Sequence, residues 1–281
     1  MPKVSMKLLR DIIRDEYVNR NISLTEVDTT VYHVKPLIEL TLDQENKLLE
    51  GDGQKKKKDQ YKQINSSTGL AVNYYKILEE LGVIKDLVFE NKIAIPLKGW
   101  PANLDVSYKR NNVLFFVESK FLEPYYNNNE ELNESYFDEN NYPKEVEANK
   151  KEWLNLFWRS KDFKYYNVSQ LCRHLLALYR YTHDIKGSEY NGEKVILQSV
   201  TWEMTQQFLG KLEQPNCDEM KKRIVQLNKE AKECQEIFNS FIANIKWENM
   251  EFQTLHYNEM LDDIKGSKHY LEFCKRYFFI D

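Results

Sequence analysis

The chain has 281 residues, of which 42% are hydrophobic and 30% are charged, a composition that supports a large buried core. Its formal net charge of −4 argues against a protein that coats nucleic acid by charge alone, because such proteins are strongly basic. The sequence has no apolar run long enough to span a membrane and no apolar segment near its N-terminus. We therefore expect a cytoplasmic protein with no membrane partner.

Four cysteines are widely spaced and form no CxxC pair, so the sequence supports neither a zinc site nor a disulfide framework. They are Cys172, Cys217, Cys234 and Cys274. We expect reduced thiols that pack in the interior.

The N-terminal part is predicted to be mostly helical. Apolar residues at helical spacing predict helices over residues 7–20 and 40–49, with a β-prone segment at residues 29–34 between them. A run of four lysines follows. It consists of Lys55, Lys56, Lys57 and Lys58. Such a run is usually a solvated loop, but its position before the predicted core also fits an arm that contacts the phosphates of nucleic acid.

A core helix is predicted to begin near Ser66 or Ser67, either of which can cap its N-terminus, and to end at Gly82. Its apolar positions suit a buried helix. Glu79 or Glu80 on this helix could face a functional site, and both could equally face solvent.

Short β-prone runs at residues 87–90 and 93–97 lead into a predicted hairpin over residues 103–124. If Asn111 and Asn112 form a two-residue turn, Asp105 lies directly opposite Glu118 on the same face of the hairpin. Residues two apart on a strand share a face, so Lys120 stands beside Glu118 while Ser119 points the other way. Two carboxylates and one lysine are therefore predicted to converge.

Two neighbouring carboxylates repel each other, and a divalent cation relieves that repulsion. Mg²⁺ suits such a pair, because it keeps several waters and binds through one or two carboxylates together with substrate phosphate; Mn²⁺ is an alternative. Lys120 could then orient or deprotonate a water molecule.

After the hairpin, residues 125–151 form a long polar segment, which we expect either to close over substrate or to be disordered. Residues 168–181 predict an amphipathic helix on which Gln170 and His174 share one face. Both could line the site, although His174 could instead cap or pack. A strand is predicted at residues 194–202.

These residues carry a family resemblance. Asp105, followed along the next strand by Glu118, Ser119 and Lys120, resembles the signature of the PD-(D/E)XK nuclease superfamily, although Leu104 stands where a proline is often found. Residues 65–75 and 170–178 resemble two helices of a bacterial branch of restriction-endonuclease-like proteins. The predicted order α-β-β-β-α-β over residues 65–203 is also the core order of that superfamily.

The resemblance implies an α/β fold with a restriction-endonuclease-like αβββαβ core, a mixed sheet, and helical extensions at both ends. The expected divisions are an N-terminal helical extension at residues 1–60, a nuclease-like core at 61–205 and a C-terminal helical extension packed on the core at 206–281. A long helix predicted at residues 218–243 would serve packing or homodimer formation.

The implied function is metal-dependent hydrolysis of phosphodiester bonds in DNA. Asp105 and Glu118 would hold Mg²⁺, with the carbonyl oxygen of Ser119 as a further ligand. Lys120 would position the attacking water or stabilise the transition state, and Gln170 and His174 would line the pocket. Two alternatives stay open: a nuclease-like module that binds nucleic acid or protein without cleavage, and a phosphoesterase that acts on RNA or nucleotides.

Overall fold

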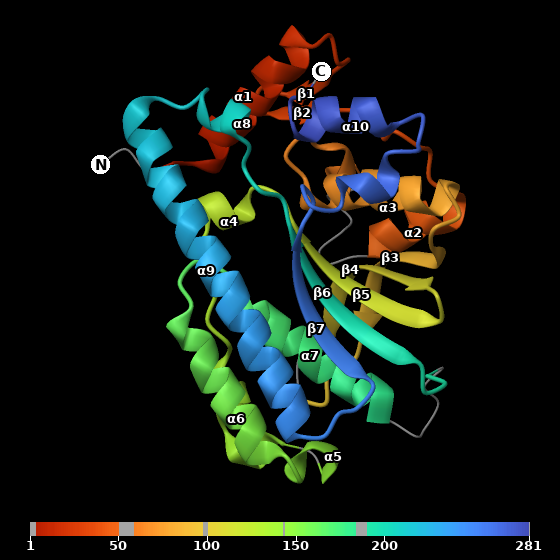
Figure 1. The fold of residues 1–281 in the computed structure, drawn as a ribbon, viewed down its shortest axis with the longest axis vertical. Helices are drawn as coiled ribbons and strands as arrows, with labels where there is room; N and C mark the ends of the chain where they lie inside the picture. Colours follow the sequence, from red (N-terminus) through yellow and green to blue (C-terminus); the bar gives the residue numbers. More distant parts are fainter. Residues whose placement is uncertain (1–3, 51–58, 98–100, 143, 184–189, 281) are drawn as a thin grey trace.

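The computed structural model describes residues 4–50, 59–97, 101–142, 144–183 and 190–280 (Figure 1). The lysine run from Lys55 to Lys58 lies outside the described residues. None of the described helices is both long and apolar enough to cross a lipid bilayer.

A five-stranded mixed sheet forms the centre of the molecule (Figure 1). Its strands in spatial order are β3 (Lys85–Ile93), β4 (Ala102–Arg110), β5 (Val113–Lys120), β6 (Lys194–Thr201) and β7 (Met250–His256). β3, β4 and β5 pair antiparallel, whereas β5, β6 and β7 pair parallel. The expected α/β class with a mixed sheet is confirmed.

Two helices cover opposite faces of this sheet. α7 (Val168–His183) contacts Glu118 of β5 through His174, while the carbonyl of Ser67 in α3 (Ser67–Glu80) accepts a hydrogen bond from the Ser119 hydroxyl. Because neighbouring residues of a strand point to opposite faces, these contacts place α3 and α7 on opposite sides of β5. The expected helix start is also confirmed, since the Ser66 side chain caps α3.

The hairpin of β4 and β5 has the predicted turn and register. Asn111 and Asn112 both have positive φ angles, 51° and 61°, as a two-residue type I′ turn requires. Val106 pairs with Val117, which is the register that brings Asp105 towards Glu118. The two-residue turn therefore sets the strand register that brings the predicted site residues together.

The strand before the hairpin differs from the prediction of two short strands at residues 87–90 and 93–97. One strand, β3, runs from Lys85 to Ile93 and pairs with β4 along its length, with a register shift between Lys85 and Val88. Asp86 and Glu90 within it have positive φ angles. The polar residues Asn91 and Lys92 stay in the strand because pairing with β4 outweighs their low strand propensity.

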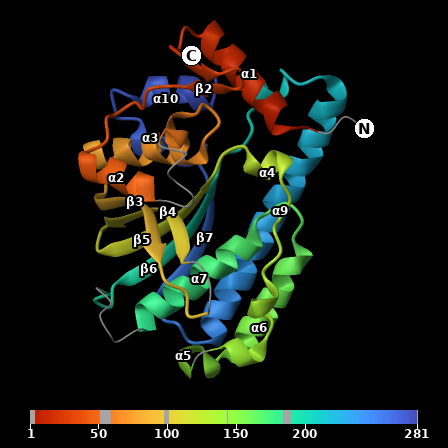
Figure 2. The same ribbon diagram turned by 180° about the vertical axis from the view of Figure 1, so that it is seen from behind.

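A pair of helices forms a further layer beside the sheet. α6 (Lys150–Arg159) lies along α9 (Gln214–Asn244), and α9 in turn packs against β7 (Figures 1 and 2). Trp153 of α6 and Phe241 of α9 place their ring centroids 4.5 Å apart. The long helix predicted at residues 218–243 is confirmed and begins slightly earlier, with a proline in its first turn.

The C-terminal part is not purely helical, contrary to expectation, because β7 joins the sheet parallel to β6. The alternation of Met250 and Phe252 with polar residues is a short strand pattern that only pairing with β6 makes stable. The tail does pack on the core as predicted: α10 (Tyr270–Tyr277) contacts α3, and the Tyr277 hydroxyl accepts a hydrogen bond from Asn73 at 2.7 Å.

The N-terminal part packs beside the C-terminal tail. It comprises α1 (Met6–Asn19), the small antiparallel pair β1 (Thr25–Asp28) and β2 (Val31–His33), and α2 (Leu42–Glu50). Arg20 donates a hydrogen bond to the carbonyl of Phe279 at 2.7 Å, which ties the two ends together.

The remaining helices are short. They are α4 (Glu123–Tyr126), α5 (Lys144–Glu147), α8 (Gln206–Leu209) and the 3₁₀ turns η2 (Gln60–Lys62), η3 (Glu134–Tyr136), η4 (Glu139–Asn141), η5 (Ser160–Asp162) and η6 (Leu261–Ile264). The four cysteines are buried and free, as expected.

Candidate active site

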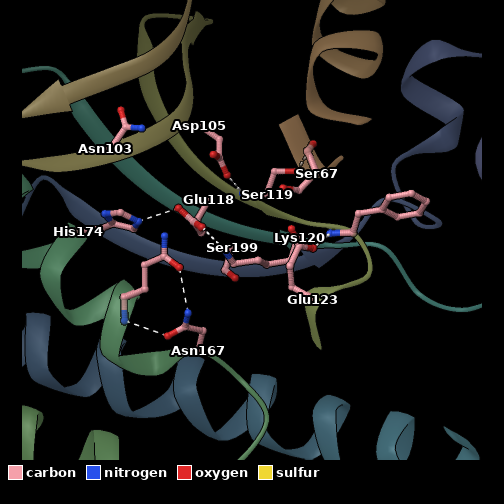
Figure 3. Close-up of polar contacts among 12 residues, drawn as sticks. Ser67, Asn103, Asp105, Glu118, Ser119, Lys120, Glu123, Asn167, His174 and Ser199 are labelled. Atoms are coloured by element: carbon pink, nitrogen blue, oxygen red, sulfur yellow. Dashed lines mark hydrogen bonds and ion pairs between the residues drawn. The ribbon is translucent and has the colours of Figure 1, made fainter. Parts of the chain in front are cut away.

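Glu118 lies at the end of β5 between two basic side chains (Figure 3). One carboxylate oxygen, Oε1, is 2.5 Å from Nζ of Lys120, and the other, Oε2, is 2.7 Å from Nε2 of His174. The Glu118 side chain is only 3% exposed. The prediction that Lys120 stands beside Glu118 is confirmed. His174, for which capping or packing was the alternative, contacts the central carboxylate directly.

The Glu118 carboxylate and its basic neighbours stabilise one another electrostatically. Burial alone raises the pKa of Glu118, but the charges and hydrogen bonds of Lys120 and His174 outweigh burial and lower that pKa to about 2. Burial lowers the pKa of Lys120, but Glu118, Asp105 and Glu123 together raise it above its ordinary value. Lys120 is therefore a cation at neutral pH. In this state it can donate hydrogen bonds and stabilise negative charge, but it cannot accept a proton from water.

Asp105 on β4 is oriented by the backbone of the neighbouring strand. Its Oδ2 atom accepts a hydrogen bond from the Ser119 N–H at 2.7 Å (Figure 3). Burial and the negative charge of Glu118 raise the pKa of Asp105 well above its ordinary value, while Lys120 and the Ser119 N–H act in the opposite direction. Glu90 adds a further negative charge nearby. In the metal-free site Asp105 is therefore easier to protonate than an ordinary aspartate.

Ser119 is held rigidly on the opposite face of β5, as the strand alternation predicts. It is fully buried, and its Oγ lies 2.8 Å from the Tyr257 hydroxyl and 3.5 Å from the Ser67 carbonyl. Its backbone N–H, which orients Asp105, is the contact that the structure adds. The role of its carbonyl oxygen as a metal ligand stays a prediction.

A cavity of about 480 Å³ opens above Glu118 and Lys120. Residues of β5, β6 and α7, of the segment between β5 and α6, and residues 165–167 before α7 form its walls. Gln170 lines it as predicted, and the Asn167 side-chain amide donates a hydrogen bond to the Gln170 side-chain oxygen at 3.0 Å. Asp105 is not among the lining residues. It therefore acts on the cavity through Glu118, Lys120 and the Ser119 backbone.

The described residues of the polar segment at 125–151 are anchored by a few buried side chains, and some of them form one wall of this cavity. Leu132, Tyr136 and Tyr142 are buried, and the Tyr142 hydroxyl donates to the Tyr136 carbonyl at 2.7 Å. Arg223 of α9 donates to the Pro124 carbonyl at 2.6 Å. The described part of this segment therefore has the position that a cover over the site needs.

Glu79 and Glu80 do not take part in the site, contrary to one expectation. The carboxylate of Glu79 lies 2.5 Å from Nζ of Lys76, and that of Glu80 lies 2.8 Å from Nζ of Lys268. Neither acid lines the cavity. The spacing of Lys76 and Glu79, three residues apart on one helix, indicates such a local ion pair from sequence alone.

Sequence reasoning missed several residues of the cavity. Glu123 and Arg173 line it, and Ser199 of β6 receives a hydrogen bond from the Tyr166 hydroxyl at 2.7 Å. Arg173 lies next to His174 and three residues after Gln170, so the helical face that those two predict also includes it. Glu123 is only three residues after Lys120 in the sequence, so its proximity to the site could also have been expected. No sequence spacing relates Ser199 or Tyr166 to the predicted site residues.

The donor set fits a weakly ligated hard cation. Within the ranges that the structure describes, no group of three or more His, Cys, Asp or Glu side chains is arranged to hold a metal ion. Two carboxylates remain, Asp105 and Glu118, and burial together with the negative charge of Glu118 raises the pKa of Asp105. A Mg²⁺ or Mn²⁺ ion that keeps most of its waters fits this set, whereas a metal ligated entirely by protein does not.

Comparison with protein-family models, with curated proteins and with solved structures finds no match to this chain.

The pKa of Asp105 predicts an unusual effect of pH on stability. A raised pKa in the folded state means that the metal-free protein loses stability as pH rises from the ordinary value near 4 towards the raised one. Asp105→Asn removes this loss and keeps an acceptor for the Ser119 N–H. At pH 8 in EDTA, we expect the free energy of unfolding of the variant to exceed that of the wild-type protein by about 1–2 kcal/mol. This corresponds to an unfolding temperature that is higher by a few degrees.

The difference in unfolding temperature between the variant and the wild-type protein should shrink as pH falls towards 4. Asp162→Asn, at an exposed position, serves as the control and should show no such trend. A constant difference across this pH range would contradict the assigned pKa of Asp105.

Proposed function

We propose that this chain is a metal-dependent nuclease that hydrolyses phosphodiester bonds, with DNA as the expected substrate. The observation that supports the proposal most is that one hairpin brings Asp105, Glu118 and Lys120 together, with Glu118 and Lys120 lining a cavity and Asp105 bound to the Ser119 N–H behind them. We also propose that α3, β3, β4, β5, α7 and β6 form a restriction-endonuclease-like core. Their order and the change from antiparallel to parallel pairing at β5 support it.

Asp105 and Glu118 would hold Mg²⁺, or Mn²⁺ in its place. Such an ion, when bound, lowers the pKa of a coordinated water and neutralises charge on the phosphate. The chain's own residues supply the rest. Lys120, a cation beside Glu118, would donate to a phosphate oxygen or to the attacking water. Gln170 would position substrate in the same cavity.

His174 would act as a positioning residue. Its Nε2 contacts Glu118 Oε2, and the same carboxylate pairs with Lys120. The imidazole therefore helps to orient the Glu118 carboxylate and, through it, the Lys120 ammonium group. Its other ring nitrogen, Nδ1, is buried and has no hydrogen-bond partner among the residues that the structure describes, where the contact with Glu118 is the one that orients the ring.

A binding module without cleavage is the second candidate, and one observation favours it. Both oxygens of Glu118 are already paired, one with Lys120 and the other with His174, so this network is satisfied without a metal. A metal would have to take the place of at least one of these contacts. Because a metal ion would compete with Lys120 and His174 for Glu118, the metal dependence of activity distinguishes a nuclease from a binding module.

The two candidates separate in a cleavage assay. We expect the purified chain to cut DNA in Mg²⁺ and to lose this activity when EDTA removes the metal, with recovery when Mg²⁺ is restored. DNA binding without cleavage in Mg²⁺ or Mn²⁺ would favour the binding module. Cleavage of RNA alone would replace DNA by RNA as the substrate.

A further inference from the structure

The reacting groups of the proposed nuclease lie inside a cavity and not on an open surface. Glu118 is 2% exposed and Lys120 has a side chain 19% exposed. The segment from Asn127 to Tyr136 covers them from one side. A phosphodiester must therefore enter the cavity to reach Lys120.

The size of the cavity limits what can enter. A volume of about 480 Å³ falls in the range of pockets that hold one small-molecule ligand, roughly 300–1,000 Å³. One nucleotide with its flanking phosphates is a ligand of this class. A double helix is far wider, and its backbone could reach Glu118 only if a nucleotide left the stack, which costs unstacking and unpairing energy.

The charge of the cavity also disfavours a duplex. Its lining includes four carboxylates and only two bases, and the bases are Lys120 and Arg173. Glu130 and Glu131 are exposed at this wall. A duplex carries about one charge per 1.7 Å of its axis, whereas each strand alone carries about one per 3.4 Å. Acidic side chains around the opening therefore repel a duplex more strongly than a single strand.

Other groups in the cavity are available to hold a nucleotide. The side-chain amides of Asn127 and Asn128 line it and make no hydrogen bond within the part of the chain that the structure describes. Amides can pair with the edges of bases. Arg173 also lines it, beside the Tyr136 side chain with which it interacts, and no carboxylate of the described residues lies within ion-pair distance, so its positive charge can still attract a phosphate.

We infer that the cavity accepts one nucleotide of an unpaired strand, and that the site acts on single-stranded nucleic acid, including single-stranded arms, in preference to intact duplex. This inference rests on the proposed nuclease function and specifies its substrate. Arg173 and Lys120 bind phosphate, the amides contact the base, and Glu130 and Glu131 exclude the second strand.

The test compares one labelled DNA strand in three forms under single-turnover conditions with Mg²⁺: alone, in a blunt duplex, and in a duplex with an unpaired arm. We expect the free strand and the arm to be cut at least about tenfold faster than the blunt duplex, because only the duplex must unpair a nucleotide. Cuts in the third substrate should fall within the arm. Equal rates on the strand and the blunt duplex would overturn this inference and leave the nuclease proposal standing. Failure to cut any of the three would overturn both.

A pair of charge variants tests whether Glu130 and Glu131 exclude duplex DNA from the cavity. E130Q/E131Q should narrow the ratio of single-strand to duplex cleavage several-fold, because it removes the repulsion of the second strand. E134Q/E147Q removes the same charge from exposed carboxylates that do not line the cavity and should leave the ratio unchanged. An unchanged ratio in E130Q/E131Q would show that these residues do not exclude the duplex.

Discussion

Lys120→Ala is expected to lower the single-turnover rate of DNA cleavage by roughly 10²-fold or more, which is the usual effect of removing a group that stabilises charge in the transition state. Lys120 is a largely buried cation that contacts Glu118 at 2.5 Å and lines the cavity, so no other residue can easily replace it. Binding of DNA should change much less, because phosphate contacts elsewhere remain. Rate and affinity are measured on the same preparation.

Lys109 provides a matched control for this variant. It lies on the same hairpin and is paired with Glu193 at 2.9 Å, but it does not line the cavity. Lys109→Ala should therefore cleave DNA at close to the wild-type rate. If Lys120→Ala also cleaves at that rate, Lys120 has no part in the reaction.

Glu118→Gln is expected to destabilise the metal-free protein by about 3 kcal/mol, because it leaves the Lys120 cation buried without its nearest counterion. This result is opposite in sign to that of Asp105→Asn, although both variants remove one carboxylate from the same site. The difference follows from the pairing: Glu118 has a lowered pKa and two basic partners, whereas Asp105 has a raised pKa. Urea unfolding in EDTA at neutral pH measures both.

Glu193→Gln is the control for the loss of an ion pair at the surface. Its partner Lys109 has a side chain 30% exposed, so the loss should be about 0–1 kcal/mol. If Glu118→Gln is no more destabilising than Glu193→Gln, the buried network around Glu118 does not hold the site together.

The part of the site that lies within one hairpin follows from local sequence. Asn111 and Asn112 tolerate positive φ angles, and the two-residue turn they form determines which residues of β4 and β5 face each other. Strand alternation then separates Glu118 and Lys120 from Ser119. The caps and apolar periodicity of α3, α7 and α9 are local signals of the same kind, and these helices lie close to where they were predicted.

Contacts between distant segments could not be predicted in this way. His174 reaches Glu118 only because α7 packs across the sheet, and Ser119 meets Tyr257, which is 138 residues away in sequence. β7 was missed because its few apolar residues form a strand only when β6 is already beside them. Arg223 of α9 donates a hydrogen bond to the Pro124 carbonyl, next to the cavity wall, and no local pattern indicates this contact.

The central claim is that Asp105 and Glu118 hold a metal ion that phosphodiester hydrolysis requires. The most direct measurement is the single-turnover cleavage rate of single-stranded DNA as a function of Mg²⁺ concentration, for the wild-type protein and for Asp105→Asn. We predict a saturable dependence on Mg²⁺ for the wild-type protein and no cleavage in EDTA. The variant should need at least about tenfold more Mg²⁺, because one of two anionic ligands is lost. Cleavage that is independent of Mg²⁺, or the same Mg²⁺ dependence in both proteins, would contradict the claim.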